Sequence, residues 1–459
     1  IRFISVILIH LHQNLSFTMS LLNRYTKIFL IMISLCYGQD VYSAYGVGEL
    51  TFASNAAVMG IGSNGLMPSF QEYISLSNPS TWLRIPFAYV SLNYGGTQIK
   101  DRDYDYNNVL SGLNQFQFIL PIKGRYAVGV GFQPFSSQLY SLESDDINEK
   151  FIEGDTLTIN KAINGSGGIS ELIFSLGAKL TEKEQLGLKL EYLFGSNRRQ
   201  TVFNIKEGEH DLDYIYNQRN IYNGTLINGY FSSHRLGFGS RIIRLSGSVK
   251  SVLHPVHINH FSFQPFEDSN GNGYYDIADY PRPVGVDSIP PAAIDTVLSN
   301  QISPFEYAFG FDLELTEMIH AQGEISLWSD LNDRKINLTS ALNQRILSYQ
   351  HFNIGIIRFA RSLPRVWHES LHFRGGIIHR SYELENQLFA NGQSENYNIN
   401  DIGLSVGFGI KFGVTKNQID LGLNLINRSD SHNSDKLITN FNIGISIGDL
   451  WFVKRRVKK

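Results

Sequence analysis

Apolar residues recur at every second position in several stretches of this chain. In residues 172–194, one row of apolar side chains precedes a charged break at 181–185 and a second row follows it. The same pattern recurs at 116–132, 305–327 and 402–425, and more faintly at 236–253 and 352–380. A period of two is the period of a β-strand, so each stretch predicts an antiparallel hairpin.

The lengths of these strands and of their connections favour a membrane barrel. Each strand has about nine to eleven residues, which is the length a tilted strand needs to cross a bilayer. The linkers between hairpins are long and polar, at 95–113, 133–170, 195–233, 254–304, 329–350, 381–401 and 428–439. Tight turns that alternate with long loops are typical of outer-membrane barrels. With an opening strand at 87–94 and a closing strand at 440–448, the pattern predicts an all-β, antiparallel transmembrane barrel of about 14 strands.

Charged residues on the second face of these strands indicate which face meets lipid. A Lys or Arg that faces lipid near the middle of the membrane costs about 2–4 kcal/mol. The charged positions on the second face are Lys179, Lys189, Glu191, Asp312, Glu314 and Lys411. We therefore expect the apolar face to contact lipid and the charged face to line a lumen.

Composition and charge exclude several other classes of protein. The net charge is −3 and the only concentrated basic run is the short tail at 454–459, so the sequence does not predict nucleic-acid binding. The single cysteine, Cys36, cannot form a disulfide within the chain. After residue 39, no apolar stretch approaches the length of a transmembrane helix.

An export signal is predicted near the start of the chain, preceded by a further short segment. Residues 19–38 begin with Met19, carry the basic Arg24 and Lys27, and continue into a short apolar run that ends at small residues. We expect residues 1–18 to lie upstream of the mature protein. This organisation predicts a signal peptide at 19–38, an N-terminal segment at 39–86 and a barrel at 87–459, located in a Gram-negative outer membrane.

Three motifs in this chain resemble the FadL-type family of outer-membrane transporters for hydrophobic molecules, especially its Bacteroidetes variants. They are YGVGEL at 45–50, the glycine-rich AVMGIGSNGL at 57–66 and the Asn78-Pro79-Ser80 element. The resemblance implies a hatch at 39–86 that plugs the lumen, and lateral passage of hydrophobic ligands toward the membrane. The implied hatch or hinge residues are Gly60, Gly62, Gly65, Asn78 and Pro79. An ordinary turn into the first strand is the alternative for Asn78-Pro79.

The function implied by this resemblance is transport of hydrophobic small molecules, such as long-chain fatty acids, across the outer membrane. The ligand-binding residues stay unknown. The expected partners are outer-membrane lipid, the hydrophobic ligand and the barrel-assembly machinery. A non-transporting partner of a secretion or surface-attachment machine is one alternative, and a general diffusion porin is another.

The loop EDSNGNGYYDIADYPRP contains a calcium-type motif. Oxygen-bearing residues stand at the spacing of a calcium loop, and Gly273 allows its sharp turn. The predicted ligands are Asp268, Asn270, Asn272, Tyr274 (through its carbonyl), Asp276 and Asp279. The sequence thus predicts a structural calcium in loop 268–279, within the long external loop 254–304. A flexible loop without metal is the alternative.

The remaining chemistry-bearing residues form no recognisable catalytic motif. The sequence has no G-x-S-x-G, no H-E-x-x-H and no phosphate-binding glycine loop, so we expect neither an enzyme nor a catalytic cofactor. A triad spread over several strands stays open as an alternative. The histidines His254, His257 and His260 are three residues apart, so on an extended chain successive side chains point to opposite faces and cannot converge on zinc without a turn. The adjacent Arg198 and Arg199 fit either lipid phosphates or a solvated rim.

Overall fold

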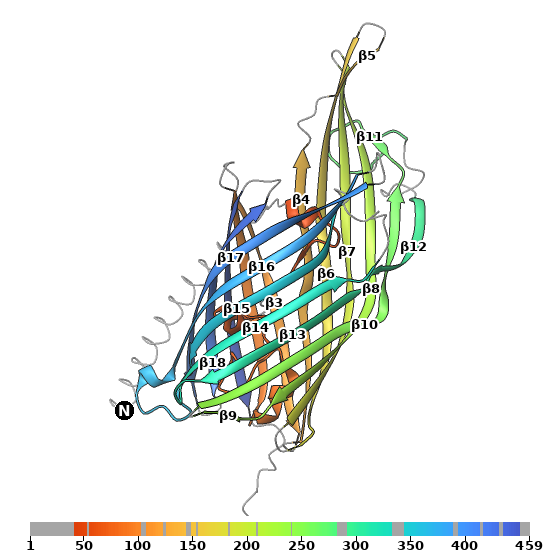
Figure 1. Ribbon diagram of the computed structural model, residues 1–459. Coiled ribbons are helices and arrows are strands. Elements are labelled where there is room, and N and C mark those ends of the chain that lie inside the picture. Colours follow the sequence, from red (N-terminus) through yellow and green to blue (C-terminus); the bar gives the residue numbers. More distant parts are fainter. Residues whose placement is uncertain are drawn as a thin grey trace, which may run out of the picture.

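The computed structural model describes residues 41–449, apart from 53–54, 102–106, 123–124, 144–147, 153–154, 182–183, 208–209, 240, 282–291, 333–343, 389–392, 414–415 and 431–434. The proposed upstream segment, the signal peptide, Cys36 and the basic tail therefore lie outside the described residues. The described chain forms a closed antiparallel β-barrel (Figure 1).

Fourteen strands form the barrel wall, as the sequence pattern predicts. They are β2(Ala88–Asp101), β3(Asn107–Ile122), β4(Tyr126–Glu143), β6(Asp155–Lys179), β7(Glu184–Glu207), β8(His210–Ser233), β10(Arg241–Phe263), β13(Pro304–Glu314), β14(Ile319–Asp330), β15(Gln344–Arg358), β16(Leu371–Leu388), β17(Gln393–Phe412), β18(Asn417–Asp430) and β19(Lys436–Asp449). Pairing of β19 with β2 closes the sheet. Closure leaves no lipid-exposed sheet edge, whose unpaired amides would each cost several kcal/mol in a bilayer.

The prediction of a loop at 195–233 is wrong. These residues continue β7 and form β8, which pair with each other over their whole lengths. Much of the expected loop at 133–170 likewise belongs to β4 and β6. The first strand of the faint hairpin predicted at 236–253 is also misplaced, because β10 pairs instead with β8 and, through only three residues, with β9(Leu236–Phe238).

The long strands β6, β7 and β8 rise beyond the rest of the barrel and form an arm (Figure 1). Three shorter strands, β5(Asn148–Ile152), β11(Phe266–Asp268) and β12(Ala292–Ile302), pair with β6, β8 and β10 in or beside this arm. The opposite end of the barrel carries the short turns, which lie on the periplasmic side in outer-membrane barrels. The arm therefore lies on the extracellular side.

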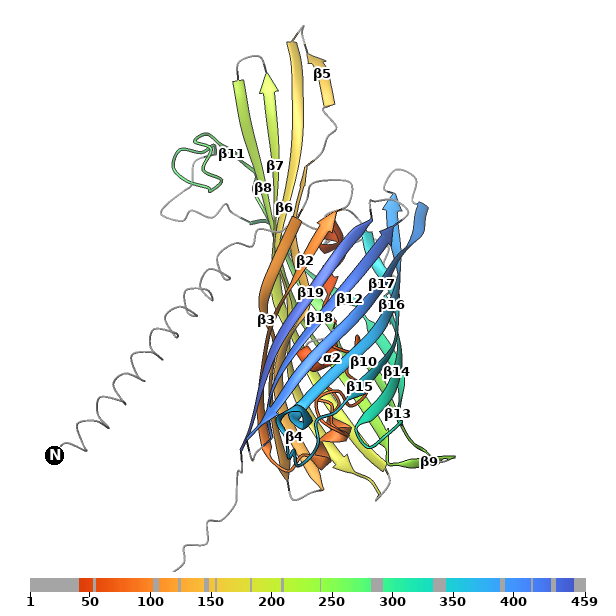
Figure 2. The same ribbon diagram turned by 90° about the vertical axis from the view of Figure 1, so that its left-hand side faces the viewer.

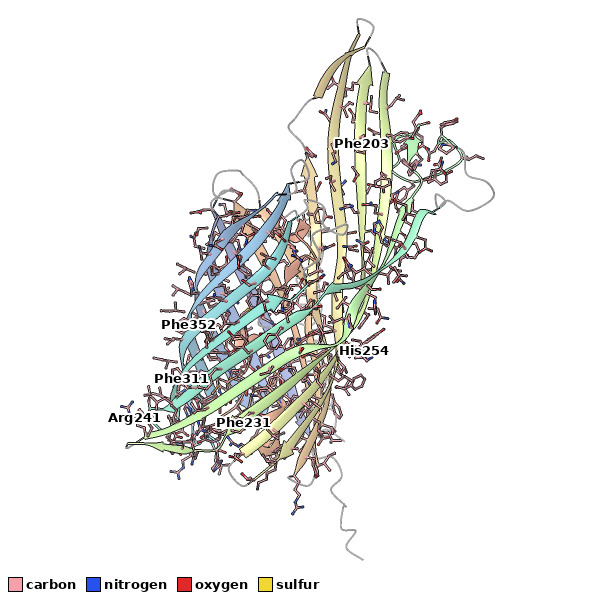
Figure 3. The ribbon with its side chains drawn as sticks, turned by 45° about the vertical axis from the view of Figure 1, so that its right-hand side comes forward. Phe203, Phe231, Arg241, His254, Phe311 and Phe352 are labelled. Atoms are coloured by element: carbon pink, nitrogen blue, oxygen red, sulfur yellow. The ribbon has the colours of Figure 1, made fainter. Side chains whose placement is uncertain are left out.

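Alternate residues of each strand meet two different environments. Phe231 and Phe352 lie on the outer wall with exposed fractions of 40% and 45% (Figure 3). On the inner face, Lys189, Glu191 and Asp312 are buried. An exposed apolar face around a polar interior is the arrangement of a barrel whose outer surface contacts lipid. Among the described residues, no helix is both long enough and apolar enough to span a bilayer.

The N-terminal segment, residues 41–86, lies inside the barrel (Figure 2). It contains η1(Val41–Ala44), β1(Glu49–Leu50), α2(Ala56–Met59) and η2(Pro79–Arg84). A further short helix, η3(Trp367–Ser370), lies in the connection between β15 and β16. Every residue of α2 is buried, and α2 packs against β17, β18 and β19. Its apolar side chains thus find a core within the lumen rather than in a domain of their own.

Candidate functional site: a gap in the barrel wall

The ladder between β3 and β4 is incomplete. These strands pair over seven positions, from Ile122 opposite Tyr126 to Phe116 opposite Phe132. Beyond that point, β3 pairs only with β2, while β4 pairs with β6 and with the N-terminal segment. Seven residues of a strand tilted by about 40° rise only about 17 Å, whereas the apolar band is about 25 Å tall. The wall therefore opens within the outer part of the membrane.

The N-terminal segment lies along β4 where β3 has departed. In β1, Glu49 pairs with Ser137 and Leu50 pairs with Ser136. The Thr51 amide donates to the Phe135 carbonyl at 3.0 Å. These bonds satisfy part of the free β4 edge, which would otherwise be left without partners.

Side-chain contacts extend this attachment toward the extracellular end. Ser136 Oγ donates to the Val47 carbonyl at 2.8 Å, and Gln138 Nε2 donates to the Gly46 carbonyl at 3.0 Å. The attachment of residues 46–51 to β4 is therefore made of backbone and polar side-chain bonds.

A cavity of about 310 Å³ lies at this gap. Both edges of the gap line it, through Leu110, Gly112 and Leu113 of β3 and Ser137 and Leu139 of β4. Its inner wall includes Phe52, Met59, Ile99, Ile426 and Ile438. This volume is at the lower end of the range of small-molecule sites. The gap thus joins the lipid-facing surface to a largely apolar space above the N-terminal segment.

Charged residues form the polar side of the same cavity. Arg428 makes a bidentate ion pair with Asp401, with Nε–Oδ1 and Nη2–Oδ2 distances of 2.8 and 3.0 Å. Its Nη1 also lies 3.2 Å from Glu49 Oε1 in β1. Arg380 stacks over the Phe52 ring, 4.4 Å from its centroid. Each arginine is therefore held in place by a partner, and Arg428 ties β1 to the wall of β17 and β18.

Glu324 holds the middle of the N-terminal segment. Its carboxylate accepts bonds from Ser63 Oγ at 2.6 Å, from the Asn64 amide at 3.2 Å and from the Leu66 amide at 3.2 Å. The side chain of Asn64 also donates to Ser326 Oγ at 2.8 Å. No motif in the sequence singles out Glu324. Its inward position on β14 follows from the alternation, but its partners do not.

The glycines expected at the hatch lie in this middle part. Gly60 packs against Gly407 of β17, where an added Cβ would lie 2.6 Å from the Gly407 Cα. Gly62 and Gly65 have φ values of +73° and +95°, which favour glycine because a Cβ strains this backbone region. These positions fit tight turns packed against the barrel wall. Their role as hinges stays a prediction.

Asn78 and Pro79 begin η2 at the periplasmic end of the lumen. Asn78 caps the helix by accepting from the Ser80 amide at 3.1 Å, and its Nδ2 donates to the Leu66 carbonyl at 2.8 Å. Pro79 stands at the first helical position and lies against Gly177 and Gly187 of the wall. This geometry is an N-cap followed by a proline, which is a stable local arrangement. Whether it also works as a hinge stays a prediction.

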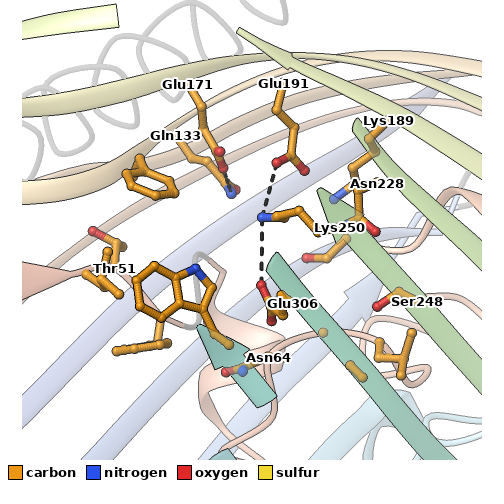
Figure 4. A pocket seen from close by; sticks show the side chains of 18 of the residues that line it. Thr51, Asn64, Gln133, Glu171, Lys189, Glu191, Asn228, Ser248, Lys250 and Glu306 are labelled. Atoms are coloured by element: carbon orange, nitrogen blue, oxygen red, sulfur yellow. Dashed lines mark hydrogen bonds and ion pairs between the residues drawn. The ribbon is translucent and has the colours of Figure 1, made fainter. Parts of the chain in front are cut away.

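A second cavity, of about 130 Å³, is lined mostly by polar groups (Figure 4). Lys250 Nζ lies 3.1 Å from Glu191 Oε2 and 4.0 Å from Glu306 Oε2. Gln133 and Glu171 are joined by a hydrogen bond nearby. This buried charge network fills the lumen below the arm and makes that region unsuited to an apolar ligand.

The calcium-type loop is folded in the structure, with its side chains turned onto its own backbone. Asp268 Oδ2 accepts from the Gly273 amide at 2.6 Å, and Asp279 Oδ2 accepts from the Asp276 amide at 2.6 Å. Hydrogen bonds from the Ala278 amide, Asn270 and Asn272 lower the pKa of Asp276. Tyr274 is exposed, and its amide donates to Asn272 Oδ1 at 2.7 Å. No group of three or more His, Cys, Asp or Glu residues suited to a metal occurs in the described part of the chain. The calcium site stays a prediction.

The histidines of 254–260 do not converge. His260 faces the lumen and its Nδ1 lies 2.7 Å from Asn220 Oδ1, whereas His254 and His257 are exposed. Irregular pairing of β10 with β8 between Val252 and His257 breaks the strict alternation at this point.

The described residues thus define a plugged transmembrane barrel of fourteen strands with a gap in its wall. A protein-family model described as BamG matches residues 23–232, which include the N-terminal segment and both edges of the gap. No curated protein matches the chain.

Two solved structures are similar to this chain over most of their length. The Pseudomonas putida toluene transporter TodX is 12% identical, with 88% of this chain and 100% of that chain covered and a TM-score of 0.51. A Pseudomonas aeruginosa FadL homologue is 11% identical, with 87% and 98% covered and a TM-score of 0.49. The match to TodX shows a shared barrel fold.

Proposed function

We propose that this protein is an outer-membrane channel that admits hydrophobic small molecules through the gap between β3 and β4. The observation that carries the proposal is the cavity at this gap, which both strand edges and an apolar inner wall line. A hydrophobic compound dissolved among acyl chains reaches such a cavity without crossing water.

Onward passage requires the N-terminal segment to move. This segment closes the lumen beneath the cavity, and β1 occupies the free edge of β4. Displacement of residues 46–51 from β4 widens the gap. It breaks the two-residue β1 ladder, the bonds from Thr51, Ser136 and Gln138, and the contact of Arg428 with Glu49. Fatty acids and aromatic hydrocarbons are the two ligand classes to compare, since both are apolar and differ in length.

The test fills the gap with a bulky side chain. Gly112 lines the cavity, and nothing lies within 4 Å of an added Cβ there. We expect Gly112→Trp to reduce uptake of toluene and palmitate by cells to the level of cells that lack the protein. The matched control is Gly229→Trp, because Gly229 faces outward on β8 away from the gap and an added Cβ there meets nothing closer than 4.0 Å. Unchanged uptake by Gly112→Trp, with normal assembly, contradicts the proposal.

A second function is favoured by one observation, the match of residues 23–232 to the BamG family model. The name of that model is associated with the barrel-assembly machinery, so the second proposal is a partner barrel of that machinery. Such a role needs no path through the lumen. Purification of the intact protein in mild detergent distinguishes the two: a stoichiometric complex with the machinery supports this role, and Gly112→Trp leaves that complex intact. A monomeric protein without stable partners counts against it.

A further inference from the structure

Arg198 and Arg199, adjacent in the sequence, lie on opposite faces of β7. Arg199 faces inward and its Nε donates to Gln218 Oε1 at 2.6 Å. Arg198 is exposed on the outer face, in the same alternation as Tyr192 and Phe194. The choice between lipid phosphates and a solvated rim therefore concerns Arg198 alone.

The structure places a second arginine directly beside Arg198. Arg219 of β8 is its cross-strand partner in the β7–β8 ladder. Cβ atoms of directly opposed residues lie about 4.5–5.5 Å apart, and like charges at this spacing are destabilising unless an anion lies between them. Two neighbouring strands thus present two guanidinium groups on one face.

Neither of these two arginines has an acidic partner among the described residues. Among the described residues, the arginines that form salt bridges are others than these two. Arg219 Nε is buried and has no hydrogen-bond partner. Asp295 of β12 is the acidic residue in the same cross-strand row. Phe261 of β10 lies between Asp295 and Arg219, so their backbones are about 10 Å apart. Gln200 follows Arg198 by two residues on the same face of β7. Its side-chain amide donates to the Gly273 carbonyl of the calcium-type loop at 3.4 Å.

The position of the pair along β7 fixes the environment that it meets. Tyr192 and Phe194 are stacked, with ring centroids 5.9 Å apart, and end the outward apolar row that begins at Leu186. Aromatic rings at this height are typical of the membrane–water interface. Arg198 follows Phe194 by four residues, so it lies at most about 13 Å further along the strand. The pair therefore lies at the level of the outer-leaflet head groups, on the lipid side of the wall.

We propose that Arg198 and Arg219 bind the phosphate of a phosphorylated glycolipid in the outer leaflet, of the lipid A type. Guanidinium groups bind phosphate oxygens through paired N–H donors, and a phosphate here offsets the repulsion between the two arginines. The exposed polar side chains just below the pair, Asn223, His257 and Asn259, face the sugar region of the same lipid. This site is separate from the gap between β3 and β4 and does not depend on the proposed transport.

The test measures lipid that stays bound to the intact protein after gentle detergent extraction, by native mass spectrometry. We expect wild type to retain diphosphorylated lipid A, and Arg198→Gln/Arg219→Gln to retain at least ten-fold less. Lys161→Gln is the matched control, because Lys161 is exposed on the other face of the arm. Retention by the double variant equal to that of wild type overturns the proposal.

Two measurements on the wild-type protein keep the proposal testable if the double variant fails to assemble. We expect lipid A stripped of both phosphates to bind at least ten-fold more weakly than the phosphorylated form. We also expect vesicles of phosphatidylglycerol and 10 mM inorganic phosphate to leave the bound lipid A in place. Equal binding of the stripped lipid, or displacement by either competitor, overturns the assignment to a phosphorylated glycolipid.

Discussion

Replacement of Glu324 by alanine should release the middle of the N-terminal segment from the barrel wall. The carboxylate accepts bonds from Ser63, Asn64 and Leu66, and all three donors are buried or partly buried in the lumen. A buried donor left without a partner costs about 1–3 kcal/mol. Loss of three bonds therefore weakens the attachment by about 3 kcal/mol or more.

Hydrogen exchange at the Asn64 and Leu66 amides measures this attachment directly. Every 1.4 kcal/mol corresponds to a factor of ten, so 3 kcal/mol predicts exchange at these amides more than 100-fold faster in Glu324→Ala. Glu306→Gln is the control: Glu306 lies in the same lumen but contacts Lys250 and Tyr349 rather than the N-terminal segment. If both amides exchange in Glu324→Ala as slowly as in wild type, the carboxylate does not hold the segment.

Three other predictions test the cavity wall, the plug and the calcium-type loop. Arg428→Ala leaves Asp401 buried without its partner, so thermal unfolding should shift by the equivalent of about 3–5 kcal/mol; an unchanged melting temperature contradicts the role of this pair. Deletion of 45–70 should either raise ion conductance in planar bilayers or prevent assembly, whereas a tight, well-assembled barrel counts against a plug. Calcium should raise the melting temperature of wild type but not of Asp268→Asn/Asp276→Asn. The pKa of Asp276 is lowered in the folded loop. The contribution of its ionised carboxylate to stability is therefore complete above its ordinary pKa and is lost as the pH falls through the lower, folded value. The rise in melting temperature caused by calcium should accordingly persist into mildly acidic buffer.

The class of fold follows from the pattern of residues along the chain. Period-two alternation assigns side chains to two faces, and charges such as Lys189 and Glu191 on one face exclude that face from lipid. This reasoning works because both faces of a membrane strand meet sharply different solvents. It failed at 195–233 for two reasons. The extracellular parts of β7 and β8 lie beyond the membrane, where the apolar alternation fades and the residues resemble a polar loop. Residues 224–233 of β8 pair with 184–193 of β7 within the barrel wall, but their outward row includes Thr225 and Gly229, which interrupt the apolar pattern.

The gap and the contacts around it follow from the folded barrel and not from the local pattern. The apolar alternation of β3 ends at Phe116, and Asn114 is an extra residue against β2, but the sequence does not distinguish a loop there from a strand that keeps β2 as its partner and loses β4. The same holds for Glu324, which meets Ser63 from 261 positions away, and for Arg219, which meets Arg198 through the β7–β8 register. The local sequence pattern indicates which solvent a residue faces, because this depends on the polarity of the residue's own side chain. The residue that lies opposite it on the neighbouring strand depends on the register of all the strands in the closed sheet.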